Sequence, residues 1–137
     1  MIKILIDTTI IYELLTEEGK GGPYFKLAEA IKSQKITGVI SVVTLTELIN
    51  ILGKDIYKGK IDELISTKLV IVDTDQAIAI CAGELRMNQK LFTGDSLIAA
   101  TGIIENIKHI LTNDADFDAV RNLIKPINLK TALKMAG

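Results

Sequence analysis

The sequence predicts an α/β fold in which a central parallel sheet of about five strands is flanked by helices. Short β-branched and aliphatic runs alternate with longer segments whose apolar residues recur every three or four positions. The runs are almost continuously apolar, as is typical of parallel strands buried on both faces. Regular alternation of strand and helix indicates parallel strands joined by helical crossovers. We expect residues 1–137 to form a single domain, because this length is usual for one domain.

Each predicted strand is a short apolar run that ends at a polar or turn residue. The first run stops at Asp7 and the second at Ser41. The last run contains Pro126, which lacks a backbone N–H donor and therefore favours the edge of a sheet. The predicted strands cover residues 2–6, 36–40, 69–72, 108–112 and 126–129.

The predicted helices show helical spacing and recognisable ends. Apolar residues from Leu45 to Leu52 recur at helical spacing, and Gly53 closes that helix. Asp73 and Gln76 resemble a capping box at the start of another helix. The predicted helices cover residues 8–15, 25–34, 41–52, 56–65, 74–89, 95–104, 113–123 and 130–135.

One predicted helix, residues 95–104, is apolar on every side. Leu97 to Ala100 are all apolar, and no charge follows until Glu105. This pattern is typical of a helix that is buried on all sides. The run is too short and too interrupted to span a membrane. Asp95 stands at its start, where free N–H groups and the helix dipole favour a negative charge. We therefore expect Asp95 to be ionised and held still, either as an N-cap or as a metal ligand.

Composition limits the class of function. The net charge is −1, so any basic surface for nucleic acid is local. Aromatic residues make up 4% of the chain, which argues against a base-stacking platform of the single-strand-binding kind. The single cysteine, Cys81, precludes an internal disulfide and fits a reducing compartment. No signal peptide or transmembrane segment is visible, so we expect a cytoplasmic protein with no membrane partner.

Acidic residues cluster at one predicted edge of the sheet. Ligands of parallel sheets bind beyond the carboxyl ends of the strands. Asp7 follows the first strand, Glu47 lies in the helix after the second, and Asp95 opens the apolar helix. Asp114 follows the fourth strand, with Asp116 close behind. Each could serve only as a helix cap, with Glu47 completing a capping box with Thr44. Together, however, they would repel one another strongly unless a cation neutralised them.

The ligand types indicate which cation this would be. Carboxylate oxygens suit Mg²⁺ or Mn²⁺, whereas one histidine and one cysteine supply a zinc site poorly. A bound Mg²⁺ or Mn²⁺ polarises phosphoryl oxygen and lowers the pKa of water, which suits phosphodiester hydrolysis.

The acids lie in four short segments, which are Ile4-Leu5-Ile6-Asp7-Thr8, Thr46-Glu47-Leu48, Asp95-Ser96-Leu97-Ile98-Ala99-Ala100-Thr101 and Leu111-Thr112-Asn113-Asp114-Ala115-Asp116-Phe117. In this order the segments resemble the successive motifs of the PIN domain. The last two are the most specific, and the resemblance covers nearly the whole chain. In length the chain is similar to stand-alone prokaryotic members, the VapC toxins of toxin–antitoxin pairs.

The resemblance implies a three-layer fold with strand order 3-2-1-4-5 and a metal-dependent endoribonuclease that acts as the toxin of such a pair. Its implied partners are RNA, an antitoxin protein and a second copy in a homodimer. The implied ligands of Mg²⁺ or Mn²⁺ are Asp7, Glu47, Asp95 and Asp114. The resemblance gives Asp116 an accessory role and lets Thr112 orient a carboxylate or a water, whereas Asp73 would lie at the sheet edge as a cap.

Other residues admit two interpretations. Arg86 could hold an RNA phosphate or be a solvated helix charge. The lysines within residues 54–60 could line an RNA-binding rim or be ordinary surface charges. Tyr12 and Leu15 could join a hydrophobic groove for an antitoxin segment or pack in the core.

Two rival functions remain open at this point. A phosphoacceptor receiver domain has a similar α/β architecture, and Lys125-Pro126 superficially suits it. That class needs two adjacent acids after the first strand, where this chain has Asp7-Thr8, and it leaves Glu47 and Asp95 unused. The other rival is a PIN-like fold that only binds a partner, and the intact set of acids argues against it.

Overall fold

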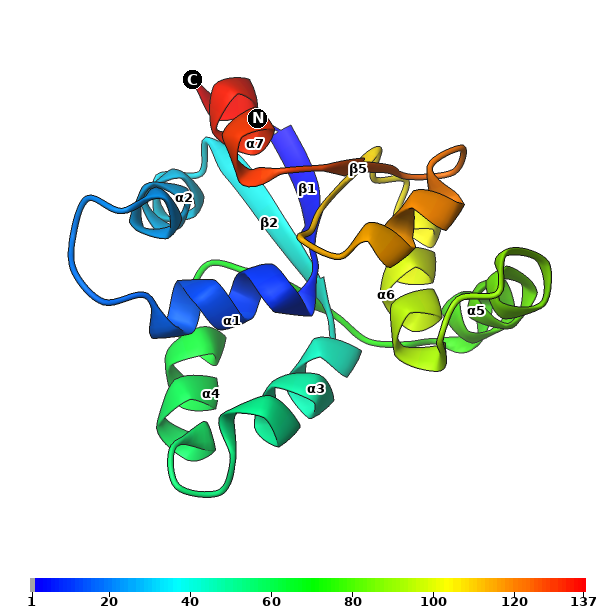
Figure 1. Ribbon diagram of the computed structural model, residues 1–137, viewed down its shortest axis with the longest axis horizontal. Helices are drawn as coiled ribbons and strands as arrows, with labels where there is room; N and C mark the ends of the chain where they lie inside the picture. The colour runs from blue at the N-terminus through cyan, green and yellow to red at the C-terminus, as the bar shows by residue number, and fades with distance from the viewer. Residues whose placement is uncertain (1) are drawn as a thin grey trace.

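The computed structural model describes residues 2–137, in which parallel strands alternate with helices (Figure 1). The strands are β1 (Ile2–Ile6), β2 (Ile36–Ser41), β3 (Val70–Val72), β4 (His109–Leu111) and β5 (Lys125–Ile127). The helices are α1 (Thr8–Thr16), α2 (Pro23–Lys32), α3 (Val43–Leu52), α4 (Tyr57–Ile65), α5 (Gln76–Gln89), α6 (Thr93–Ile104) and α7 (Leu129–Ala136), with a 3₁₀ helix η1 (Ala115–Val120). The predicted alternation is confirmed, although the segment after β4 forms 3₁₀ turns.

The five strands of the described chain form one parallel sheet in the order β3-β2-β1-β4-β5. The predicted fold class and strand order are therefore confirmed, and β5 lies at an edge as expected from its proline. The register places Ile6 of β1 beside Leu111 of β4. The next residues, Asp7 and Thr112, consequently leave the sheet side by side, and the Asp7 N–H donates to the Leu111 carbonyl at 3.0 Å.

Helices cover both faces of this sheet. Ile4 and Ile6 pack into a core with α1, α2, α3, α4 and α7. Leu5 points the other way, into a second core with α5, α6 and η1, because successive side chains of a strand alternate between faces. Figure 1 shows α1, α2 and α4 on one side of β1 and β2, and α5 and α6 on the other. β1 is thus buried on both faces, and its carboxyl end is held rigidly.

The apolar helix α6 packs directly on β1. Ile98, Ala99 and Ala100 are fully buried. A Cβ atom at Gly102 would lie 2.8 Å from Leu5 Cδ2 and 2.6 Å from the end of Ile124, so the glycine allows the helix to approach the sheet closely. Within residues 2–137, no helix is long and apolar enough to cross a membrane.

The start of α6 differs from the prediction. The helix begins at Thr93 with Phe92 as its N-cap, so Asp95 is the third helical residue and not the cap. The reason is that the Ser96 N–H already donates to the Phe92 carbonyl at 2.9 Å, which closes a helical turn before Asp95. Asp95 still lies within the first turn, where the helix dipole acts.

Two other helices also begin later in the chain than predicted. The N-cap of α5 is Asp75, whose carboxylate accepts a hydrogen bond from the Ile78 N–H at 2.9 Å, so the predicted Asp73 cap is wrong. Extended backbone continues through Asp75, and the helix can begin only after it. Ser41 ends β2 and its hydroxyl accepts from the Val43 N–H at 3.1 Å, so α3 starts at Val43.

Candidate metal centre

Acidic side chains from several elements meet at the carboxyl edge of the sheet. Among the described residues, Asp95, Asp114 and Asp116 each offer a carboxylate oxygen within 4.8 Å of the others. Asp7 and Glu47 lie near enough that their charges raise the pKa of Asp95. The five acids therefore share one site, although they come from the β1–α1 junction, α3, α6 and the segment that begins after β4.

The pKa of Asp95 rises to about 7 in this environment. Burial is the largest cause, and the charges of Asp114, Asp7, Glu47 and Asp116 act in the same direction. The expectation that Asp95 is simply ionised is therefore wrong, because burial and repulsion outweigh the helix dipole. At neutral pH the carboxyl group divides between protonated and ionised forms unless a cation neutralises the cluster.

Asp7 is the most deeply buried of these acids, at 3% exposure. Burial raises its pKa, and hydrogen bonds from Thr9 and Thr112 oppose that effect. Both hydroxyls donate to Oδ2 of Asp7, each at 2.8 Å. The Thr112 hydroxyl also accepts from the Asp114 N–H at 2.9 Å. Thr112 therefore fixes the side chain of one acid and the backbone of another.

Glu47 is held by Thr8, which in turn lies against Thr44. The Thr8 hydroxyl donates to Glu47 Oε1 at 2.5 Å and lies 3.1 Å from the Thr44 hydroxyl. Thr44 therefore bonds across to α1, and the alternative in which it forms a capping box with Glu47 is wrong. The only local signal was that Thr8 directly follows Asp7, while the contact with Glu47 joins residues far apart in the chain.

The opposite side of the Glu47 carboxylate lies against Gly94. A Cβ atom at that position would lie 2.5 Å from Glu47 Oε2. The glycine in the first turn of α6 therefore leaves space for the carboxylate. Glu47 is confined between the start of α1 and the start of α6, next to Asp95.

The cap explanation holds for Asp114 but does not conflict with metal binding. Its Oδ1 accepts from the Asp116 N–H at 2.9 Å and starts η1. A carboxylate has a second oxygen, which can serve as a ligand. This donor set consists of carboxylate oxygens, fits a hard divalent cation, and offers no nitrogen or sulfur for zinc.

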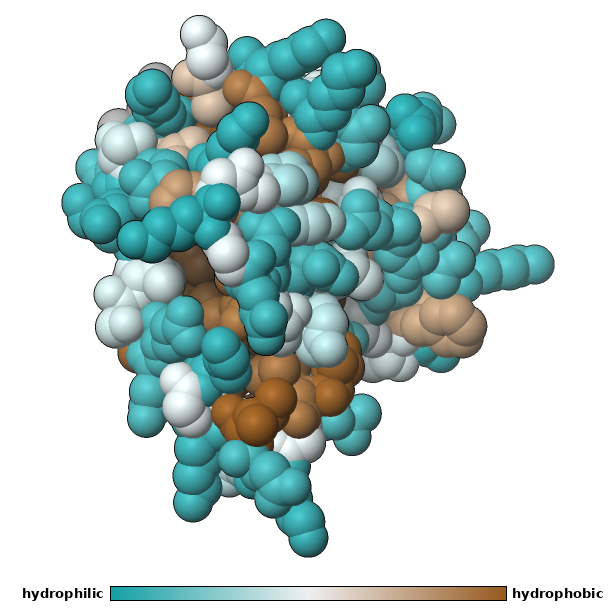
Figure 2. Space-filling view, turned by 60° about the vertical axis from the view of Figure 1, so that its left-hand side comes forward, coloured by the Kyte–Doolittle hydropathy of each residue, from teal (hydrophilic) through white to brown (hydrophobic). Residues whose placement is uncertain are grey.

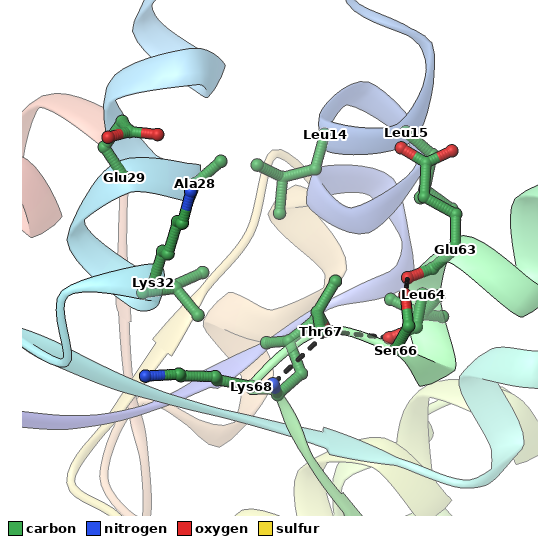
Figure 3. Close-up of a pocket in the computed structure, with 12 residues that line it drawn as sticks. Leu14, Leu15, Ala28, Glu29, Lys32, Glu63, Leu64, Ser66, Thr67 and Lys68 are labelled. Atoms are coloured by element: carbon green, nitrogen blue, oxygen red, sulfur yellow. Dashed lines mark hydrogen bonds between the residues drawn. The ribbon is translucent and has the colours of Figure 1, made fainter.

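A pocket lies away from the acids, between α1, α2 and the end of α4. It has a volume of about 380 Å³. Leu15 is part of its wall, whereas Tyr12 packs against the adjacent core. Figure 2 shows a hollow with apolar residues among hydrophilic ones on this face, and Figure 3 shows how Leu14, Ala28 and Leu64 surround the space. Charged residues at the pocket are Glu29, Lys32, Glu63 and Lys68.

Comparison with known proteins identifies the class. The PIN domain model matches residues 4–123, and the chain belongs to the PIN domain family. The receiver-domain alternative is therefore wrong. No curated protein sequence matches this chain.

Solved structures of similar fold cover almost the whole chain. The VapBC2 structure from Rickettsia felis, bound to a promoter DNA fragment, contains a chain 25% identical to this one, with a TM-score of 0.74 and coverage of 93% of this chain and 98% of that one. FitAcB from Neisseria gonorrhoeae gives 22% identity, a TM-score of 0.68 and the same coverages. VapBC-1 from nontypeable Haemophilus influenzae gives 20% identity and a TM-score of 0.67, with coverage of 95% and 99%.

Proposed function

We propose that this protein is a Mg²⁺- or Mn²⁺-dependent endoribonuclease and the toxin of a toxin–antitoxin pair. The observation that carries the proposal is the convergence of five acids, of which Asp95 has its pKa raised to about 7. Such a cluster is unfavourable until a cation neutralises it. Membership of the PIN family and the likeness to VapBC2 support the nuclease and toxin assignments.

In this proposal Asp7, Glu47, Asp95 and Asp114 hold the metal, and Asp116 has an accessory role. A bound Mg²⁺ or Mn²⁺ supplies Lewis acidity toward the phosphodiester and lowers the pKa of water. The protein contributes fixed ligand positions. Thr112 orients Asp7 and Asp114, as its two hydrogen bonds allow.

Hydrogen bonding also explains how the ligands keep their geometry. Thr9 donates to Asp7 and Thr8 to Glu47, so each carboxylate has one oxygen occupied by a hydroxyl. The other oxygen of each can then turn toward the shared cation. Ligands that are locked by neighbours need little rearrangement when the substrate binds.

The experiment that tests the proposal is cleavage of single-stranded RNA by the wild-type protein and the Asp95→Asn variant. The reaction is run with Mg²⁺, with Mn²⁺ and with a chelator. Metal-dependent cleavage by the wild type alone supports the proposal. A protein that binds RNA but cleaves none with either metal would instead be the inactive binding module.

Replacement of Gly94 by alanine is expected to reduce cleavage and leave the fold intact. The new Cβ must displace the Glu47 carboxylate, and a displacement of about 1 Å can reduce the rate by up to roughly 100-fold. Because Ala favours a helix over Gly, stability should be unchanged or higher by roughly 0.5–1 kcal/mol. Steady-state kinetics and thermal melting measure the two effects.

Gly59→Ala is the matched control for this substitution. Gly59 also lies near the start of a helix, α4, and a Cβ there meets nothing within 4 Å. This variant should gain the same helix propensity with no loss of rate. Equal rates for the two variants would show that the Glu47 position does not matter.

The apolar pocket is the site that we assign to the antitoxin. Its wall is apolar and its rim carries charges of both signs, which suits an amphipathic protein segment. The likeness to VapBC2 and to a toxin–antitoxin complex from Klebsiella pneumoniae supports a protein partner, and a homodimer of the toxin is part of the same proposal. We place the protein in the cytoplasm, where its RNA substrate lies.

Replacement of Ala28 by arginine is expected to abolish neutralisation by the antitoxin. Ala28 is exposed on α2 and lines the pocket, so the long side chain should fill the pocket at a cost within about 0.5 kcal/mol of stability. A candidate antitoxin is sought as the product of a small adjacent upstream gene. Co-purification and inhibition of RNA cleavage are then measured.

Ala79→Arg provides the control for the pocket. Ala79 is exposed on α5, on the other face of the sheet. This variant should bind the antitoxin as the wild type does, and both variants should cleave RNA at the wild-type rate. Full inhibition of Ala28→Arg would place the antitoxin elsewhere.

A further inference from the structure

Phe92 is an unusual residue at the rim of the acid site. Its side chain is 72% exposed, whereas Phe117 is fully buried. Aromatic residues are scarce in this chain, at 4%. An exposed phenylalanine gains nothing from the core, so its ring is accessible to a ligand in solution.

The backbone around Phe92 is fixed while the ring remains outside. Its carbonyl accepts from both the N–H and the hydroxyl of Ser96, at 2.9 and 2.8 Å, and Ser96 is fully buried. The preceding residue, Leu91, is anchored in the core at 5% exposure. The backbone that carries the exposed ring is therefore held rigidly.

Phe92 is adjacent to the acids by helix geometry. It is the N-cap of α6, and Asp95 is the third helical residue. In a helix start these two positions lie about one turn apart, close enough for the side chain of each to meet the backbone of the other in a capping box. Phe92 is therefore anchored within one helical turn of the carboxylate that the proposed metal would bind.

Positive charge also lies at the start of α6. Arg86 on α5 is exposed, and its Nη1 donates to the Thr93 hydroxyl at 2.6 Å. The guanidinium is thus tied to the residue that follows Phe92. Lys90, at the end of α5, is also exposed. An RNA strand passing here would meet cations for its phosphates and an aromatic face for a base.

We propose that Phe92 stacks on a nucleobase of single-stranded RNA next to the phosphate held at the acid site. This inference rests on the proposed nuclease function and names the substrate class more closely. A base can stack only when it is not enclosed in a duplex, so the enzyme should prefer unpaired RNA. Preference among the four bases should be weak, because every base has a π-face.

Kinetics of Phe92→Leu, Phe92→Ala and Phe92→Tyr test the stacking. Loss of the ring should raise KM for a single-stranded oligonucleotide by roughly tenfold, within the range known for base–aromatic stacks, with kcat unchanged. Tyrosine should retain the wild-type KM, since it keeps the ring. Wild-type KM in Phe92→Leu would overturn the proposal, because leucine preserves size and apolarity without aromaticity.

A direct binding measurement uses the absence of tryptophan from the sequence. Phe92→Trp introduces the only tryptophan, which can be excited selectively over the tyrosines, and a uridine oligonucleotide added with a chelator should quench its fluorescence. Ile65→Trp is the matched control, since Ile65 is 56% exposed on α4, on the opposite face of the sheet. Equal responses of the two tryptophans would contradict stacking at residue 92.

These experiments separate the two proposals. Absence of cleavage by the wild type with either metal would overturn the proposed nuclease function, whatever the role of Phe92. Cleavage by the wild type together with an unchanged KM in Phe92→Leu would overturn only the stacking proposal and leave the nuclease proposal standing. A change in oligomeric state of Phe92→Ala at equal concentration would show that a second copy covers the ring, and would also overturn the proposal.

Discussion

Replacement of Asp95 by asparagine should reduce metal-dependent RNA cleavage by on the order of 100-fold or more. A metal ion contributes several kcal/mol of transition-state stabilisation, and each 1.4 kcal/mol or so is a factor of ten in rate. Asparagine keeps the size of the side chain but supplies no charge for the cation. The loss is measured in steady-state cleavage at saturating Mg²⁺ or Mn²⁺.

The same substitution should not weaken the fold. Asp95 carries a charge that Asp114, Asp7, Glu47 and Asp116 oppose, and asparagine removes this repulsion. Thermal melting with a chelator at pH 8 should therefore give an equal or higher Tm than the wild type. Lost activity together with an unchanged or higher Tm separates a ligand from a structural residue.

Asp62→Asn is the control for this experiment. Asp62 is exposed on α4, which packs on the other face of the sheet. The same chemical change there should leave the rate within about twofold of the wild type, as surface substitutions usually do. Cleavage by Asp95→Asn at the rate of Asp62→Asn would mean that Asp95 is not a ligand.

Much of the fold and of the acid set could be predicted from the sequence. Continuous apolar runs such as residues 2–6 indicate strands buried on both faces, and the strand order came from the motif resemblance. The rule that ligands bind at the carboxyl ends of strands then predicts a site that includes Asp7 and Asp114. Both inferences depend on local sequence pattern and on topology, which the sequence alone indicates.

The environment of each acid could not be predicted in this way. The pKa of Asp95 depends on burial by packing and on charges from three other segments of the chain. The Thr8–Glu47 hydrogen bond joins residues 39 positions apart. Local capping rules suggested a Thr44–Glu47 pair, but the tertiary contact with Thr8 took precedence. Local propensity gives way wherever long-range packing offers a better partner.

Phe92 illustrates a different limit. Low aromatic content argued against a base-stacking platform, and that argument concerns the average over the chain. The structure places one exposed phenylalanine within a helical turn of Asp95. Composition cannot indicate where a single residue lies, and one ring suffices to contact one base.

Divalent metal should stabilise the protein strongly at pH 8 and little at pH 5. The pKa of Asp95 rises from 3.8 to about 7 on folding, and that of Asp7 also rises. The folded state therefore binds more protons than the unfolded state between these values, and stability falls as the pH increases through this window. Metal needs the ionised carboxylates, so it competes with protons at pH 5 and binds freely at pH 8.

Thermal melting across pH 4–8, with chelator and with Mn²⁺, tests this coupling. At a metal concentration 100 times Kd, binding contributes about 2.7 kcal/mol, which corresponds to a rise in Tm on the order of 10 °C for a chain of this length. KCl at equal ionic strength controls for screening. Asp95→Asn should lose most of the dependence on both pH and metal, because the group that couples them is gone. An equal rise in Tm at pH 5 and pH 8 would show that the cation binds away from these carboxylates.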